Sequence, residues 1–141
     1  MGFTASLRRA LATGSSSTPD QLINHVVYET AQGKADVCTS GSYIPLGVCV
    51  GISDDGMLLI AGPGEKAHVV LDENFEYSDG IEFGVSSDGE AKVLSIADGT
   101  VTTLTETWAV GYILIPGTTY GYAAKTAECL VMPHRIIVKA S

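Results

Sequence analysis

Residues 79–99 read DGIEFGVSSDGEAKVLSIADG, and this stretch decides the predicted fold. It contains Asp-Gly pairs at residues 79–80, 88–89 and 98–99, with short apolar runs between them. Glycine supplies the positive φ of a tight turn, and Asp-Gly between apolar runs is a strong hairpin signal. Residues 81–85 also alternate apolar side chains with other residues, which is typical of a strand with one buried face. The stretch therefore predicts a compact, turn-rich β structure.

The same alternation of apolar runs and turn residues continues on both sides of this stretch. We expect strands at residues 25–29, 36–39, 44–52, 57–61, 67–71, 81–85, 93–96, 101–104, 108–115 and 135–139. A proline is excluded from a central ladder, so Pro45 should lie at the start or the edge of its strand. Residues 18–24 favour a short helix, and residues 120–131 either a short helix or a loop. The predicted fold is mainly β, a compact antiparallel β-barrel or sandwich-like domain.

Residues 1–20 differ from the rest of the chain. Phe3, Leu7 and Leu11 are spaced by four, which would place them on one face of a short helix. Residues 13–19 read TGSSSTP, a composition typical of flexible linkers. We therefore predict a flexible N-terminal arm at residues 1–20, followed by a β-rich domain at residues 21–141. The arm is either a frayed terminus or a segment that orders on a partner.

Charge is distributed unevenly along the chain, whose net charge is −8. Residues 54–106 contain twelve acidic residues and only two lysines. Such an acidic body repels phosphates, so we expect no nucleic-acid partner. Charged residues make up 17% of the chain, below the roughly 25% of typical domains, which leaves neutral surface for partners or further copies to cover. No apolar run reaches the roughly 18 residues of a membrane-spanning helix, so we expect no membrane partner.

Recognisable motifs for catalysis, metals or cofactors are missing from the sequence. The three histidines have no metal-ligand spacing, and no serine completes a Gly-x-Ser-x-Gly motif. Residues 62–67, GPGEKA, match a dinucleotide-binding pattern, but a β-like run follows instead of the required helix. We therefore expect no catalytic residues, no metal and no cofactor, and predict that the protein is not an enzyme.

The three cysteines are Cys38, Cys49 and Cys129, and their odd number and irregular spacing argue against a disulfide framework. Cys38 and Cys49 lie in apolar runs, where a free cysteine behaves as a small buried hydrophobe. This pattern predicts synthesis in a reducing cytoplasm.

Aromatic residues gather toward the C-terminal end of the chain: Trp108, Tyr112, Tyr120 and Tyr122. Such side chains are either ordinary core residues or anchors at an interface. We therefore regard these four as candidates for an oligomer interface.

Two runs carry a resemblance to a known family. Residues 43–52, YIPLGVCVGI, resemble the Pro-Leu-Gly-Val strand of the small capsid decoration proteins of tailed bacteriophages. Residues 108–114, WAVGYIL, followed by a Gly-containing loop and by residues 135–138, RIIV, resemble the end of the same family. With an Asp-Gly hairpin at residues 88–89 between them, the resemblance covers roughly residues 25–139.

The resemblance implies a structural protein of the virion that is made in the host cytoplasm. Proteins of this family, often homotrimers, bind the major capsid protein on the outer shell and brace it against internal DNA pressure, and they have no catalytic residues. We expect the arm to supply the capsid contacts, through Phe3, Leu7, Arg8, Arg9 and Leu11. Deleting residues 1–17 should then weaken capsid binding and leave the β-rich domain folded.

A different class of function is also open from the sequence, a carbohydrate-binding or adhesin-like β module. It would use Trp108 and the tyrosines as a stacking platform for sugars. Calcium could bind at the acidic residues 54–55 and 72–73.

Overall fold

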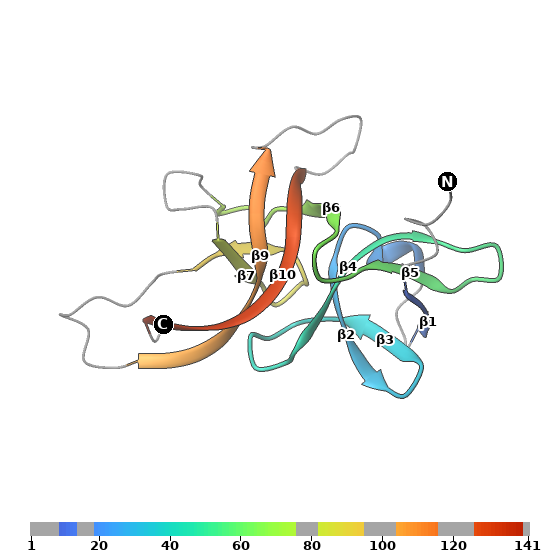
Figure 1. Cartoon of the computed structure of the whole chain (residues 1–141), viewed down its shortest axis with the longest axis horizontal. Helices are drawn as coiled ribbons and strands as arrows, with labels where there is room; N and C mark the ends of the chain where they lie inside the picture. The colour runs from blue at the N-terminus through green and yellow to red at the C-terminus, as the bar shows by residue number, and fades with distance from the viewer. Residues whose placement is uncertain (1–8, 14–18, 76–81, 95–103, 116–125, 140–141) are drawn as a thin grey trace.

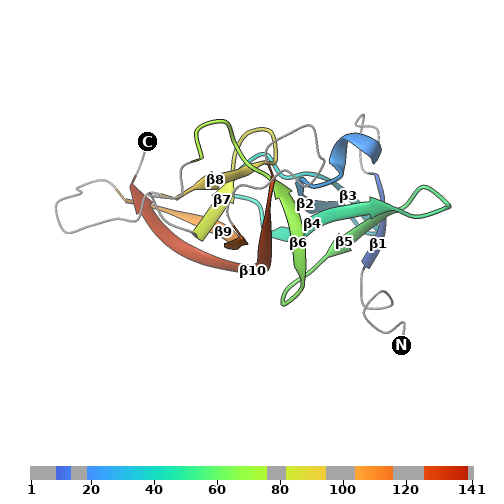
Figure 2. The same cartoon turned by 90° about the horizontal axis from the view of Figure 1, so that it is seen from above.

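The computed structural model describes residues 9–13, 19–75, 82–94, 104–115 and 126–139, which form two β-sheets that lie side by side (Figures 1 and 2). The first sheet is built from β1 (Arg9–Thr13), β2 (Val26–Ala31), β3 (Lys34–Val37), β4 (Pro45–Ile52) and β5 (Leu58–Ala61), and a 3₁₀ helix η1 (Pro19–Leu22) connects β1 to β2 along the chain. The strands of the second sheet are β6 (Lys66–Val70), β7 (Glu82–Val85), β8 (Ala91–Val93), β9 (Leu104–Ile115) and β10 (Thr126–Lys139).

The first sheet closes on itself in the order β1-β3-β2-β4-β5. Strand β1 completes the ring because it pairs with β5 in antiparallel and with β3 in parallel orientation. The other ladders of this sheet are antiparallel. Gly33 and Gly56, with φ of 77° and 83°, form the tight turns of the β2–β3 and β4–β5 hairpins.

The second sheet has the order β6-β10-β9-β7-β8, and its described ladders are antiparallel. Strands β9 and β10 are the longest of the described strands, and Figure 1 shows them curving together away from the first sheet. The β7–β8 hairpin turns at residues 86–90, where the amide of Ser86 donates to the carbonyl of Glu90 at 2.8 Å. Gly89 has φ of 76°, so the Asp-Gly hairpin predicted at residues 88–89 is confirmed.

Two apolar clusters form the core. The smaller one belongs to η1 and the first sheet and consists of Leu22, Val27, Ala35, Cys49, Leu58 and Ile60. The larger one joins the two sheets, because it contains Val26 and Val48 from the first sheet and Phe83, Val110 and Val131 from the second. Side chains of the first sheet thus alternate between the two clusters, as the period of a strand requires.

Backbone hydrogen bonds also connect the two sheets. The amide of Val26 donates to the carbonyl of Gly89 at 2.8 Å, and the amide of Trp108 donates to the carbonyl of Gly41 at 2.9 Å. The amide of Val70 donates to the carbonyl of Asn24 at 2.9 Å. The shared core and these bonds hold the sheets as one packed unit.

The mainly β, sandwich-like prediction is confirmed, and β4 begins at Pro45 as expected. Residues 19–22 form the expected helical turn, as a 3₁₀ helix. The prediction of a helix or loop at residues 120–131 is wrong for residues 126–131, which belong to β10 and pair with both β6 and β9. Residues 120–125 lie outside the described part, as do most of the strands expected at residues 93–96 and 101–104.

The expected arm also differs from the structure, because residues 9–13 are strand β1 of the first sheet. Leu11, expected on a helix, pairs in β1 with Leu58 of β5. A spacing of four is a multiple of the strand period as well as about one helical turn, so the spacing of Leu7 and Leu11 could not distinguish the two. None of the helices in the described residues is long and apolar enough to cross a membrane.

Candidate binding surface

A shallow hollow in the first sheet gathers aromatic and aliphatic side chains at the surface. It has a volume of about 470 Å³ and is lined by Tyr28, Glu29, Ser42, Tyr43, Ile44 and Leu46. We call it the tyrosine hollow, because the rings of Tyr28 and Tyr43 stack in it, 4.4 Å apart and within 5° of parallel. Tyr43 is 41% and Ile44 63% exposed. Large apolar side chains exposed next to one another are typical of a binding surface.

Hydrogen bonds fix the loop that presents Tyr43. The amide of Tyr43 donates to the carbonyl of Ser40 at 3.2 Å, and the amide of Ser42 donates to Oγ of Ser40 at 3.1 Å. Gly41 packs so closely on β9 that a Cβ there would overlap the side chain of Thr107. The loop is therefore held in place against the second sheet, and the ring of Tyr43 is presented on a fixed support.

A second surface is formed by the N-terminal half of β9 and the C-terminal half of β10. We call residues 104–109 together with residues 134–139 the β9–β10 ribbon. Among the described strands these two segments pair only with each other, because β7 pairs with β9 at residues 111–112 and β6 with β10 at residues 126–130. Neither outer edge of the ribbon has a neighbouring strand within the described structure, and the β9 edge is hydrogen-bonded to the first sheet at Trp108, whose amide donates to the carbonyl of Gly41. Unpaired strand edges are templates for the addition of another strand.

One face of the ribbon combines an indole ring, an aliphatic side chain and an ion pair. Trp108 lies opposite Arg135, and Glu106 lies opposite Ile137, so the four side chains share a face. The guanidinium of Arg135 lies over the Trp108 ring, 5.8 Å from its centroid, and Nη2 is 2.5 Å from Oε2 of Glu106. Ile137 is 50% exposed. Trp and Arg are the residue types that most often dominate binding at interfaces.

A histidine at the base of the ribbon connects three strands. Nε2 of His134 is 2.5 Å from Oε2 of Glu82 on β7, Nδ1 is 2.7 Å from the carbonyl oxygen of Met132, and the ring stacks on Tyr112 of β9. Both partners are acceptors, so both ring nitrogens donate only in the protonated imidazolium. Partial burial lowers the pKa of His134, but the two hydrogen bonds and the charge of Glu82 outweigh it and hold the pKa above its ordinary value.

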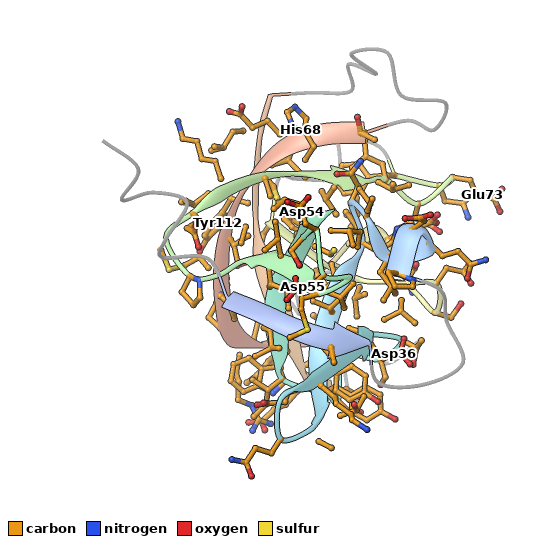
Figure 3. All side chains as sticks on the ribbon, turned by 90° about the vertical axis from the view of Figure 1, so that its right-hand side faces the viewer. Asp36, Asp54, Asp55, His68, Glu73 and Tyr112 are labelled. Atoms are coloured by element: carbon orange, nitrogen blue, oxygen red, sulfur yellow. The ribbon has the colours of Figure 1, made fainter. Side chains whose placement is uncertain are left out.

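The residues predicted to contact partners fall at different places. Trp108 lies on the exposed ribbon face, whereas Tyr112 stacks on His134 at the base of the ribbon; Figure 3 labels Tyr112. Tyr120 and Tyr122 lie outside the described residues, as do Phe3, Leu7 and Arg8. Arg9 and Leu11 are in β1 and are therefore part of the first sheet. The tyrosine hollow was not predicted, because only the pairing of β2 with β4 brings Tyr28 near Tyr43.

Groups that could bind a metal are dispersed. Figure 3 shows Asp36, Glu73 and the neighbouring pair Asp54 and Asp55 at three different places. The described residues contain no group of three or more His, Cys, Asp or Glu side chains that could hold a metal ion. Oγ of Ser53 donates to the Asp55 carboxylate, and the amide of Asn74 donates to Asp72 at 3.2 Å, so both acidic loops are hydrogen-bonded turns.

The cysteines are buried thiols, as predicted for Cys38 and Cys49. Burial raises the pKa of all three, that of Cys129 to about 12. A cysteine reacts as its thiolate, so these groups are poor nucleophiles at neutral pH.

No family model, no curated protein and no solved structure matches this chain.

Proposed function

We propose that this chain is a structural protein of a phage virion that binds the outer surface of the capsid and stabilises the shell against internal DNA pressure. Its partners are the major capsid protein and, in a homotrimer, further copies of itself. It is made in the host cytoplasm and resides on the capsid. The observation that carries the proposal is the β9–β10 ribbon, which has no further neighbouring strand among those described and presents a half-buried Trp108 beside exposed Arg135 and Ile137.

The ribbon is suited to bind a neighbouring protein chain. A strand added to an open edge gains backbone hydrogen bonds, and the side chains on the exposed face supply specificity. An isolated two-stranded hairpin is marginally stable at best in water. A strand of a capsid protein that paired with the ribbon would therefore stabilise this part of the chain and also attach the protein to the capsid.

The runs that resemble decoration proteins have the strand positions that the resemblance implies. Residues 45–48 begin β4, residues 108–114 lie in β9, and residues 135–138 lie in β10. The last two runs meet in the β9–β10 ladder at one pair, Trp108 opposite Arg135. This agreement supports the proposal at the level of the fold.

The test combines light scattering with co-sedimentation on expanded phage heads. The purified chain should form a trimer, alone or on the heads, and should sediment with them. Ile137→Lys, which places a charge on the ribbon face, should weaken head binding by at least about tenfold, since such a charge must be desolvated. Ile44→Lys, at the tyrosine hollow, is the matched surface control and should bind as the unchanged protein does. A monomer that never sediments with heads contradicts the proposal.

The alternative function as a sugar-binding module needs an open aromatic platform. In the structure Arg135 lies over the ring of Trp108, and His134 stacks on Tyr112. The two described aromatic residues of that platform thus each have a partner on one ring face. The family resemblance and the ribbon face favour the capsid-binding function, which is the one we propose.

A further inference from the structure

The tyrosine hollow lies where β2 extends beyond its neighbour β4. The ladder between them ends with Tyr28 opposite Pro45, the first residue of β4. Beyond it, residues 29–31 of β2 pair with β3 alone among the described strands. The loop that precedes β4 turns away at Tyr43 and Ile44 and forms the other side of the hollow. The tyrosine hollow is therefore open to solvent, with the edge of β2 on one side and the ring of Tyr43 on the other.

An acidic side chain lines the tyrosine hollow. Of the described residues that line it, Glu29 is charged and none is basic. The amide of Gly33 donates to Oε2 of Glu29 at 3.3 Å, and a carboxylate can accept several hydrogen bonds at once. Burial, the neighbouring Tyr43 and the carboxylate of Asp36 raise the pKa of Tyr28, in that order, so a second acid acts on the stacked rings.

The Tyr43 ring has one face that a ligand can reach. The parallel stack covers the inner face of Tyr43 with Tyr28, and 41% of Tyr43 is nevertheless exposed. A cation placed over a tyrosine ring is attracted by its electrons, and a guanidinium can also stack flat on the ring. A carboxylate beside the ring adds directional acceptors that match the donors of a guanidinium.

We propose that the tyrosine hollow binds an arginine side chain carried by an extended segment of another protein. The guanidinium stacks on the outer face of Tyr43 and donates to the carboxylate of Glu29. The stem of the arginine lies against Ile44, and its backbone follows the edge of β2 at residues 29–31. None of the described residues that line the hollow belongs to the β9–β10 ribbon, so the proposed site stands whether or not the chain binds a capsid.

The first test is an NMR titration of the full chain with short peptides. The probe is acetyl-Ala-Ala-Arg-Ala-Ala-amide, and two otherwise identical peptides contain citrulline or leucine in place of arginine. Citrulline keeps the shape of arginine but has no charge. The arginine peptide should shift the amide signals of Tyr43 and Ile44 saturably, and added salt should weaken it, because the site is open to solvent. The citrulline peptide should bind at least about tenfold more weakly, since it lacks the cation.

Variants separate the ring from the carboxylate. Tyr43→Ala should abolish the saturable shifts, whereas Tyr43→Phe keeps the ring and should retain most of the affinity. Glu29→Gln should weaken the arginine peptide about threefold to tenfold and leave the leucine peptide unaffected, because only the charge changes. Ile137→Ala, on the ribbon, is the control and should change nothing.

Several outcomes would overturn the assignment. Equal binding of the arginine and citrulline peptides would mean that the tyrosine hollow recognises the shape of the side chain and not its charge. Tight binding of the leucine peptide would make it an apolar site. Broadening of the Tyr43 and Ile44 signals with protein concentration alone would place a second copy of this chain in the tyrosine hollow. The absence of any saturable shift with the arginine peptide would leave the tyrosine hollow without this ligand.

Discussion

Gly47 and Gly111 lie where the backbone of another strand passes too close for any side chain. A Cβ at Gly47 would overlap the carbonyl oxygen of Ala61 in β5, and one at Gly111 would overlap that of Leu130 in β10. These are the glycines of the Pro-Leu-Gly-Val and Val-Gly-Tyr runs. The glycines in those two runs are therefore explained by the close packing of neighbouring strands. They indicate the fold and do not indicate a ligand.

Substituting Gly111 tests this steric role. Gly111→Ala should lower the free energy of unfolding by about 2 kcal/mol or more, because the obstructing atoms are backbone and the strand pair must shift. The matched control is Gly51→Ala, since nothing lies within 4 Å of a Cβ at that position. Its effect should stay within about 0.5 kcal/mol. Urea denaturation measures both, and equal small effects would contradict the argument.

The imidazolium of His134 predicts a pH dependence of stability. Its pKa is raised in the folded state, so its contribution is complete below the unfolded-state pKa of about 6.5 and is lost as the pH rises through the folded-state pKa. The loss should be about 0.5 kcal/mol, since the pair with Glu82 is partly solvated. Thermal unfolding between mildly acidic and alkaline pH measures it. Glu82→Gln should flatten this part of the profile, and an unchanged profile would mean that the pair is not coupled to folding.

At the scale of elements, the sequence predicted the strands better than their partners. Asp-Gly turns and alternating runs located β7 and the β7–β8 turn, because local chemistry decides both. Residues 126–131 were misassigned because their apolar pattern is decided by two strands, β6 and β9, that flank them. Of the candidate surface, Trp108 was predicted from its residue type. The stack of Tyr28 on Tyr43 depends on the β2–β4 register, which no local pattern specifies.

Strand β1 leads to a prediction about the N-terminal segment. Deleting residues 1–8 keeps strand β1, which begins at Arg9, and should therefore cost less thermal stability than a deletion that removes it. Deleting residues 1–17 should destabilise the protein strongly, because it removes the ladders with β5 and β3 that close the first sheet. Circular dichroism melting curves compare the two. The shorter deletion is thus the one that tests whether Phe3, Leu7 and Arg8 contact a capsid, and equal melting temperatures for both deletions would contradict the role of β1.

At the scale of the whole molecule, the larger core cluster makes the two sheets one folding unit. Phe83 of β7 is fully buried in it, with Val26 and Val48 of the first sheet and Val110 of the second. Because each sheet completes the other's apolar surface, neither should remain folded when the other opens. The distribution of hydrogen-exchange protection across the two sheets therefore reports whether they are coupled.

Phe83→Ala should test that coupling directly. Removing a buried phenylalanine side chain costs about 3–5 kcal/mol, and the opening free energy should fall by the same amount for the amides of Val27 in β2 and Val110 in β9. Leu58→Ala, in the smaller cluster of the first sheet, should likewise lower protection in β9, by about 2–5 kcal/mol. Native-state hydrogen exchange measures the protection of both amides in both variants. If either substitution lowered protection in its own sheet alone, the two sheets would be separate folding units, and the ribbon could open without loosening the tyrosine hollow.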